Sequence, residues 1–120
     1  MSVSYLGYDA KYITMEKRPD DTMRVGCFVC LDSDGYYVKK CLDGASFIGL
    51  AKCIRGNYVT VQVGGYCEVK YSGLKDPTTG HIKLNSGIEG TVVYDGSDMP
   101  NQYRTVLKLD TKNKIIGFIM

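Results

Sequence analysis

The stretch that decides the fold of this chain is residues 46–72, SFIGLAKCIRGNYVTVQVGGYCEVKYS. It predicts three short strands, at residues 47–54, 58–63 and 66–71. In the middle strand three valines alternate with side chains that tolerate water: Val59, Val61 and Val63 against Tyr58, Thr60 and Gln62. A period of two is typical of a half-buried strand. Gly56 and the pair Gly64–Gly65 supply turns that need positive φ, so we expect a meander with one buried face.

The same signals recur along the rest of the chain. Further strands are predicted at residues 11–15, 23–31, 36–42, 81–85, 89–94, 103–110 and 114–120. With the meander this gives about nine to eleven strands, separated by turn residues roughly every 8–12 residues. At most one helical turn fits, near residues 98–103. The sequence therefore predicts an all-β fold, a single small β-barrel or tight β-sandwich of short antiparallel strands.

Two of these strands carry further predictions. In residues 23–31 one face of the strand carries Val25, Cys27, Val29 and Leu31, and the other carries Phe28 and Cys30. Residues 114–120 end in IIGFIM, which is apolar on both faces. Such a strand is central in a sheet or covered by another chain.

Length and composition indicate one ordinary globular domain. A chain of 120 residues buries enough surface for a single core. We expect residues 1–10 to form an N-terminal arm or edge strand and residues 11–120 a single β-barrel domain. No apolar run reaches the ~20 residues that span a bilayer, and the start lacks the features of a secretion signal. We therefore expect synthesis in a cytoplasm and no membrane partner.

Five cysteines, an odd number without framework spacing, indicate free thiols in a reducing compartment. Cys27 and Cys30 form a C-x-x-C, but within a strand this spacing sends the two thiols to opposite faces. Cys41, Cys53 and Cys67 are isolated in the sequence. We expect buried structural cysteines and neither a metal site nor a redox pair.

Catalytic signals are equally weak. His81 is the only histidine, and it begins a short strand beside a turn, where we expect it to face solvent. Asp32, Asp34 and Gly35 resemble the opening of a calcium loop but lack its later ligands, so a hairpin turn explains them better. The sequence predicts no cofactor and no enzymatic activity.

A nucleic-acid partner is a weaker alternative. The net charge of +2 is small, and the basic residues are scattered. On the strand at residues 66–71, Tyr66, Glu68 and Lys70 come closest to the aromatic and basic face of a single-strand-binding barrel. The central glutamate counts against that function.

The chain is rich in tyrosine, with ten Tyr and no Trp. Tyrosine suits β-strands and is also enriched at interfaces. Tyr5, Tyr8 and Tyr12 lie in or next to the N-terminal arm, and we predict that they contact a partner.

The order of strands and turns resembles that of the small β-barrel head-decoration proteins of tailed bacteriophages. The residues that carry the resemblance are the strand at 25–31, the D-x-D-G turn at 32–35, FIGLA at 47–51, the valine-rich stretch at 59–69 and the closing VLKLDTKNKIIGFIM at 106–120. It covers residues 25–72 and 106–120, and leaves out the first twenty residues and the cysteines.

The resemblance implies a non-enzymatic virion protein, synthesised in a bacterial host cytoplasm, that binds and stabilises the outer capsid surface. Its partner would be the lattice of the major capsid protein, which it would bind as a homo-oligomer, a trimer or another symmetric cluster. Two alternatives stay open at this point: a binding module for single-stranded nucleic acid, and a phage fibre or tail domain that recognises the host surface.

Overall fold

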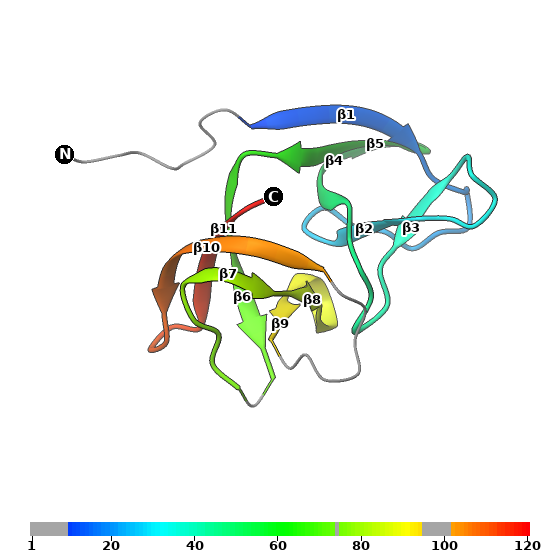
Figure 1. Cartoon of the computed structure of the whole chain (residues 1–120). Helices are drawn as coiled ribbons and strands as arrows, with labels where there is room; N and C mark the ends of the chain where they lie inside the picture. Colours follow the sequence, from blue (N-terminus) through cyan, green and yellow to red (C-terminus); the bar gives the residue numbers. More distant parts are fainter. Residues whose placement is uncertain (1–9, 74, 95–101) are drawn as a thin grey trace.

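The computed structural model describes residues 10–73, 75–94 and 102–120 (Figure 1). Nearly all of its regular structure is strand, which confirms the all-β prediction. Sheet A contains β1 (Lys11–Glu16), β2 (Phe28–Leu31), β3 (Val38–Lys40), β4 (Gly49–Arg55) and β5 (Tyr58–Gly64). Sheet B contains β6 (Tyr66–Ser72), β7 (Gly80–Lys83), β8 (Asn85–Ser86), β9 (Val92–Val93), β10 (Tyr103–Asp110) and β11 (Ile115–Ile119). No helix in these ranges is long and apolar enough to cross a membrane.

Sheet A has the strand order β1-β5-β4-β2-β3, with antiparallel neighbours. It curls around a small core of buried residues: Met23, Val29, Val38, Ala51, Val59 and Val61. Val59 and Val61 are completely buried, while Tyr58 on the other face is exposed, as the alternating pattern predicts. Just beyond β1, Lys17 bridges to Val38 of β3, so the two ends of the curled sheet approach each other.

Sheet B has the strand order β7-β10-β11-β6-β9-β8 and surrounds the larger core. Its buried residues are Phe28, Phe47, Leu50, Cys67, Tyr71, Leu84, Val92, Val106, Ile116 and Phe118. The first and last strands of this order, β7 and β8, are separated in the chain by Leu84 alone. One bent segment thus pairs with β10 at its start and with β9 at its end, and this closes the sheet into a barrel-like shape.

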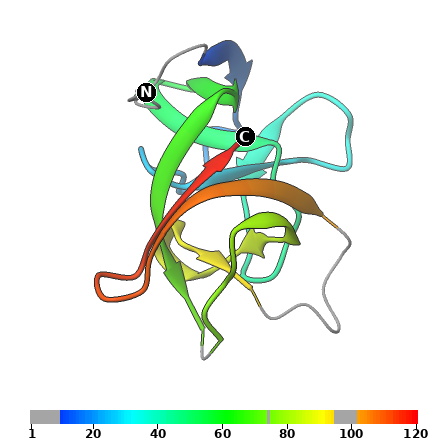
Figure 2. The ribbon, with the colours of Figure 1, turned by 60° about the vertical axis from the view of Figure 1, so that its left-hand side comes forward.

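The predicted three-stranded meander is wrong in its third strand. β5 pairs with β4 and β1, but β6 pairs with β11 and β9. The chain turns a corner at Gly65, at φ +86°, and crosses from sheet A above to sheet B below (Figure 2).

Gln62 is the side chain that fits this corner. We expected it on the wet face of its strand, but it is buried. Its Nε2 donates to the carbonyl oxygens of Gly64 at 3.0 Å and Tyr66 at 3.2 Å. The Met120 amide donates to the Gly65 carbonyl at 2.8 Å. A corner leaves backbone groups without ladder partners, and buried groups need replacements, which these bonds supply.

The predicted strand at residues 23–31 is shorter in the structure. β2 begins at Phe28, because Gly26 at φ +94° forms a turn in which the Cys27 amide donates to the Arg24 carbonyl at 3.1 Å. The residues predicted to share one face differ in burial: Val29 is completely buried, while Val25 and Leu31 are each 62% exposed. Phe28 belongs to the core of sheet B and Val29 to that of sheet A, so β2 is buried on both faces.

The two predicted C-terminal strands are present and pair as an antiparallel hairpin. β11 lies between β10 and β6, with Ile116 and Phe118 completely buried, so it is a central strand. Gly117 between them is necessary for packing, since a Cβ there would collide with the ring of Tyr66. The predicted strand at 89–94 is replaced by a 3-10 turn, η1 (Ile88–Gly90), followed by β9. The helical turn predicted near residues 98–103 falls largely outside the described residues.

Candidate functional site

Of the three tyrosines predicted to contact a partner, Tyr12 lies on β1 at the edge of sheet A. Tyr5 and Tyr8 lie outside the described residues. Tyr12 is 52% exposed, and Ile13, on the opposite face of the strand, is 45% exposed. Large apolar side chains are therefore exposed on both faces of this edge strand.

The backbone of β1 is also available at this edge. The Lys17 amide donates to the Asn57 carbonyl at 2.8 Å, in line with the β1–β5 register. Backbone groups of alternate residues in an antiparallel strand point to opposite sides, so those of Tyr12 and Thr14 point away from β5. Exposed edges are usually protected by charge, proline or bulges. Here Lys11 and the register shift beside it protect only the start of the strand.

Other strand edges are better covered. Along β8, the Gly44 amide donates to the Ser86 carbonyl at 2.7 Å and the Ser86 amide donates to the Ala45 carbonyl at 2.9 Å. β3 meets the chain again through the Lys17–Val38 bridge, and β7 is short and carries Lys83. The middle of β1, around Tyr12 and Thr14, is thus the most open edge in the described part of the chain.

Two further tyrosines share the outer face of sheet A with Tyr12. Tyr58 lies opposite Glu16 in the β1–β5 register and is 58% exposed. Tyr36 donates its hydroxyl to Glu16 Oε1 at 2.9 Å, and this hydrogen bond to a carboxylate raises the pKa of Tyr36. We call Tyr12, Tyr36 and Tyr58 the tyrosine surface. A shallow hollow within it is lined by Thr14, Cys53, Arg55, Tyr58 and Thr60.

The cysteines differ in part from the prediction of free thiols. Cys30 and Cys41 form a disulfide between β2 and the residue after β3, with their Cα atoms 5.2 Å apart. The hairpin register brings them together, since the Cys41 amide donates to the Phe28 carbonyl at 3.0 Å. Cys27, the other half of the C-x-x-C, packs against the core of sheet A instead.

The remaining thiols lack the setting of a nucleophile. Cys67 is buried, and desolvation raises its pKa to about 12, so it stays protonated at neutral pH. Cys53 is exposed on β4. No group of three potential metal ligands among His, Cys, Asp and Glu is found in the described ranges.

The other sequence candidates have structural partners. His81 is exposed, as predicted; its ring stacks on Tyr103 with centroids 5.4 Å apart, and its Nδ1 lies 3.4 Å from Thr105 Oγ1. Asp32 and Asp34 form the hairpin turn and both pair with Arg18. The guanidinium of Arg18 lowers the pKa of Asp32.

Tyr66, the aromatic residue predicted for the nucleic-acid alternative, is not available to stack on a base. Tyr66 is 4% exposed and donates its hydroxyl to Glu68 Oε2 at 2.9 Å. Glu68 also pairs with Lys108. A base cannot stack on a buried ring, so this face of β6 does not offer the aromatic platform that single-strand binding uses.

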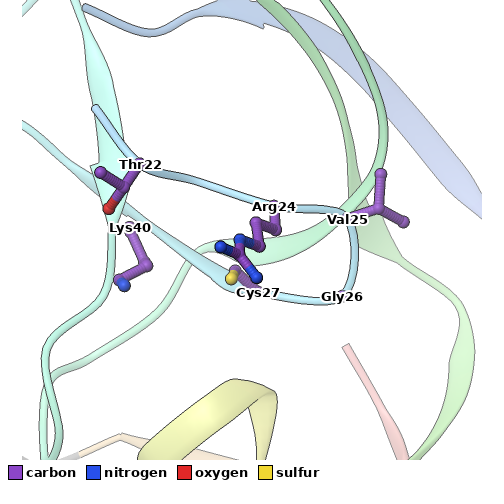
Figure 3. Close-up of a pocket in the computed structure, with 6 residues that line it drawn as sticks. All are labelled: Thr22, Arg24, Val25, Gly26, Cys27 and Lys40. Carbon is purple, nitrogen blue, oxygen red and sulfur yellow. The ribbon is translucent and has the colours of Figure 1, made fainter. Parts of the chain in front are cut away.

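A second surface feature was not predicted: an open hollow of about 590 Å³ beside β3. Figure 3 shows its lining, with Arg24 pointing toward Cys27 and Val25 turned the other way. Its lining residues are Thr22, Arg24, Val25, Gly26, Cys27 and Lys40. We call it the basic hollow, because Arg24 and Lys40 are its charged groups.

Comparisons with known proteins give no relative for this chain: no family model, curated protein or solved structure matches it significantly. The residues themselves therefore carry the functional argument. The outward direction of Tyr58 was visible in the alternating pattern. The basic hollow has no comparable sequence signal, because Arg24 and Lys40 are brought together by the fold.

Proposed function

We propose that this protein is a non-enzymatic structural protein that binds and stabilises the outer surface of a phage head, as a head-decoration or minor capsid protein. The observation that carries the proposal is the tyrosine surface next to the open edge of β1. Interface centres are enriched in tyrosine, and an open strand edge offers backbone groups to a partner strand.

Attachment to a lattice suits a small surface of this kind. A modest contact at each site becomes effective when the copies are linked, because the second contact is then intramolecular. We therefore expect a homo-oligomer, a trimer or another symmetric cluster, seated on the lattice of the major capsid protein. No cofactor is needed for this task.

The disulfide also supports the proposal. Disulfides persist in oxidising surroundings, virion surfaces included. The Cys30–Cys41 bond ties down the hairpin that carries Tyr36. A protein made in a bacterial cytoplasm and then carried on the outside of a particle would gain from such a bond after release.

Co-sedimentation with purified heads tests the proposal. Wild-type protein should pellet with heads at a fixed, high copy number per particle. Tyr12→Ala with Ile13→Ala should weaken binding at least about tenfold, the scale of a lost interface anchor. Removal of residues 1–10 should leave the fold intact and abolish binding.

Tyr103→Ala is the matched control, since Tyr103 is 50% exposed on sheet B, away from the tyrosine surface. It should bind heads like the wild type. Equal binding by the Tyr12/Ile13 variant would remove these residues from the interface. A fibre or tail domain would pellet with whole phage but not with tailless heads, and a salt-dependent shift of short oligonucleotides would favour the nucleic-acid module.

A further inference from the structure

We infer that the basic hollow binds a carboxylate on an acidic segment of the protein partner, and so adds a charged contact to the aromatic one. The inference rests on the proposed function for the identity of the partner. Its charge, rigidity and shape arguments come from the hollow itself.

The positive charge of the basic hollow is not balanced by ion pairs within the described residues. The ion pairs within the described ranges join Arg18 to Asp32 and Asp34, Lys108 to Glu68, and Lys114 to Asp76. Arg24 and Lys40 take part in none of them. The nearby carboxylate of Asp21 is directed at backbone, accepting from the Met23 amide at 2.8 Å and the Lys40 amide at 3.3 Å. Among the side chains that the structure describes, the two cations thus face the hollow without a carboxylate partner.

The backbone that carries Arg24 and Lys40 is fixed. Lys40 pairs with Val29, adjoins the disulfide at Cys41 and is held by Asp21. Arg24 begins a turn that is closed by the Cys27 amide at 3.1 Å and fastened to β4 by a 2.8 Å bond from the Gly26 amide to the Ala51 carbonyl. A binding site whose groups are already placed loses less entropy when a ligand arrives.

The shape of the basic hollow suits an extended segment. Gly90 lies against Gly26 so closely that a Cβ on Gly90 would collide with the Gly26 carbonyl. Gly26 itself faces open space, which leaves the wall of the hollow low on that side. A smaller hollow of about 100 Å³ shares Cys27 and Lys40 and continues past Gly87 and Gly90. The two hollows are therefore adjacent, and together they offer room for an extended segment.

Carboxylate is the chemistry that fits these groups. The guanidinium of Arg24 presents paired donors that match the two oxygens of a carboxylate, and Lys40 adds a point charge. The hydroxyl of Thr22 is available as a third polar group. Because both cations are exposed, the contact should weaken as salt rises.

The test is an NMR titration of the isolated, oxidised protein with a tetraglutamate peptide. Saturable shifts should appear at the amides of Gly26, Cys27, Lys40 and Gly90. Arg24→Ala with Lys40→Ala should weaken binding of the peptide about tenfold, the scale expected for lost hydrogen bonds to charged groups. Lys70→Ala with Lys112→Ala removes two exposed cations on the other sheet and should leave the affinity unchanged.

Three outcomes would overturn the inference: no saturable shift, equal losses in both double variants, or saturation by inorganic phosphate but not by the peptide. The titration contains no capsid, so its failure leaves the head-binding result untouched. Conversely, if heads fail to bind while the peptide titrates as expected, the hollow is a carboxylate site and the proposed partner is wrong.

Discussion

The two sheets of this protein treat their edges and cores differently. Sheet B wraps around the three phenylalanine rings of the chain, and its bent segment at residues 80–86 closes it. Sheet A surrounds a core made mostly of valine and alanine, and within the described residues the edge of β1 around Tyr12 and Thr14 stays open. The comparison indicates that sheet B supplies most of the stability, while sheet A presents the surfaces available to a partner.

The sheets are nonetheless one folded unit. Phe28 and Leu50 come from strands of sheet A, and Phe47 precedes β4, yet all three are buried in the core of sheet B. Phe47 packs against Phe28 with ring centroids 4.3 Å apart and against Phe118 at 6.2 Å. A change in the larger core should therefore affect the whole molecule.

The largest expected effect tests directly whether sheet B supplies most of the stability. Phe118→Ala empties a completely buried site in sheet B and should lower the free energy of unfolding by about 3–5 kcal/mol, the range for a buried aromatic. Val61→Ala in sheet A, equally buried, removes fewer atoms and should cost about 2 kcal/mol. Urea unfolding measures both. Equal losses would contradict the view that sheet B supplies most of the stability.

Next in size is the disulfide of sheet A. Cys30 and Cys41 are separated by 11 positions, and constraining a loop of that length in the unfolded chain stabilises by about 3 kcal/mol in the chain-entropy model. Cys30→Ser with Cys41→Ser should lose roughly that amount, and a reductant should lower the melting temperature of the wild type. Cys53→Ser, at an exposed free thiol, is the control. If a reductant has no effect on the wild type, the bond does not contribute to stability.

Loss of the Gln62 side chain at the corner between the sheets should have an intermediate effect on the free energy of unfolding. Gln62→Ala leaves the Gly64 and Tyr66 carbonyls without their side-chain donor, which should cost about 1–3 kcal/mol. Thr60→Ala, on the same face of β5 but only half-buried, is the comparison variant and should cost less. A neutral Gln62→Ala would mean that water replaces the amide at the corner.

The smallest effect concerns pH at the rim of sheet A. The hydrogen bond from Arg18 lowers the pKa of Asp32 below its ordinary 3.8, because it favours the ionised carboxylate in the folded state. The stabilisation is therefore fully present above the unfolded-state pKa and is lost as pH falls through the lowered value. Below about pH 4, the free energy of unfolding should fall less steeply with decreasing pH for Asp32→Asn than for the wild type. Identical profiles would show that solvent screening removes the contribution of this exposed pair.

Local patterns were enough to predict the two hairpins. The β4–β5 pair follows from alternating side chains around Gly56, which lies at φ +58°. The β10–β11 pair follows from two strands around a short polar turn. In both, the residues that determine the structure are neighbours in sequence, so the pattern contains the information.

Other features depend on contacts between distant residues. Gly65 has the same positive φ whether the chain returns as a hairpin or turns a corner, and the outcome depends on β11, which pairs with β6 some fifty residues further on. The disulfide depends on the register of β2 with β3. At the surface, Tyr12 was predicted to contact a partner from its position near the arm, whereas the basic hollow exists only once residues 22–27 lie beside Lys40.

The most open edge of the described residues, on β1, limits how copies of this protein associate. A β-protein with two accessible edges can add subunit after subunit and grow into a fibre. In the described part of this chain, β3 at the other edge of sheet A is bridged at Val38 by Lys17, so a strand added at β1 would end the growth of the ribbon. Such a protein can reach a high local concentration without polymerising through its sheets.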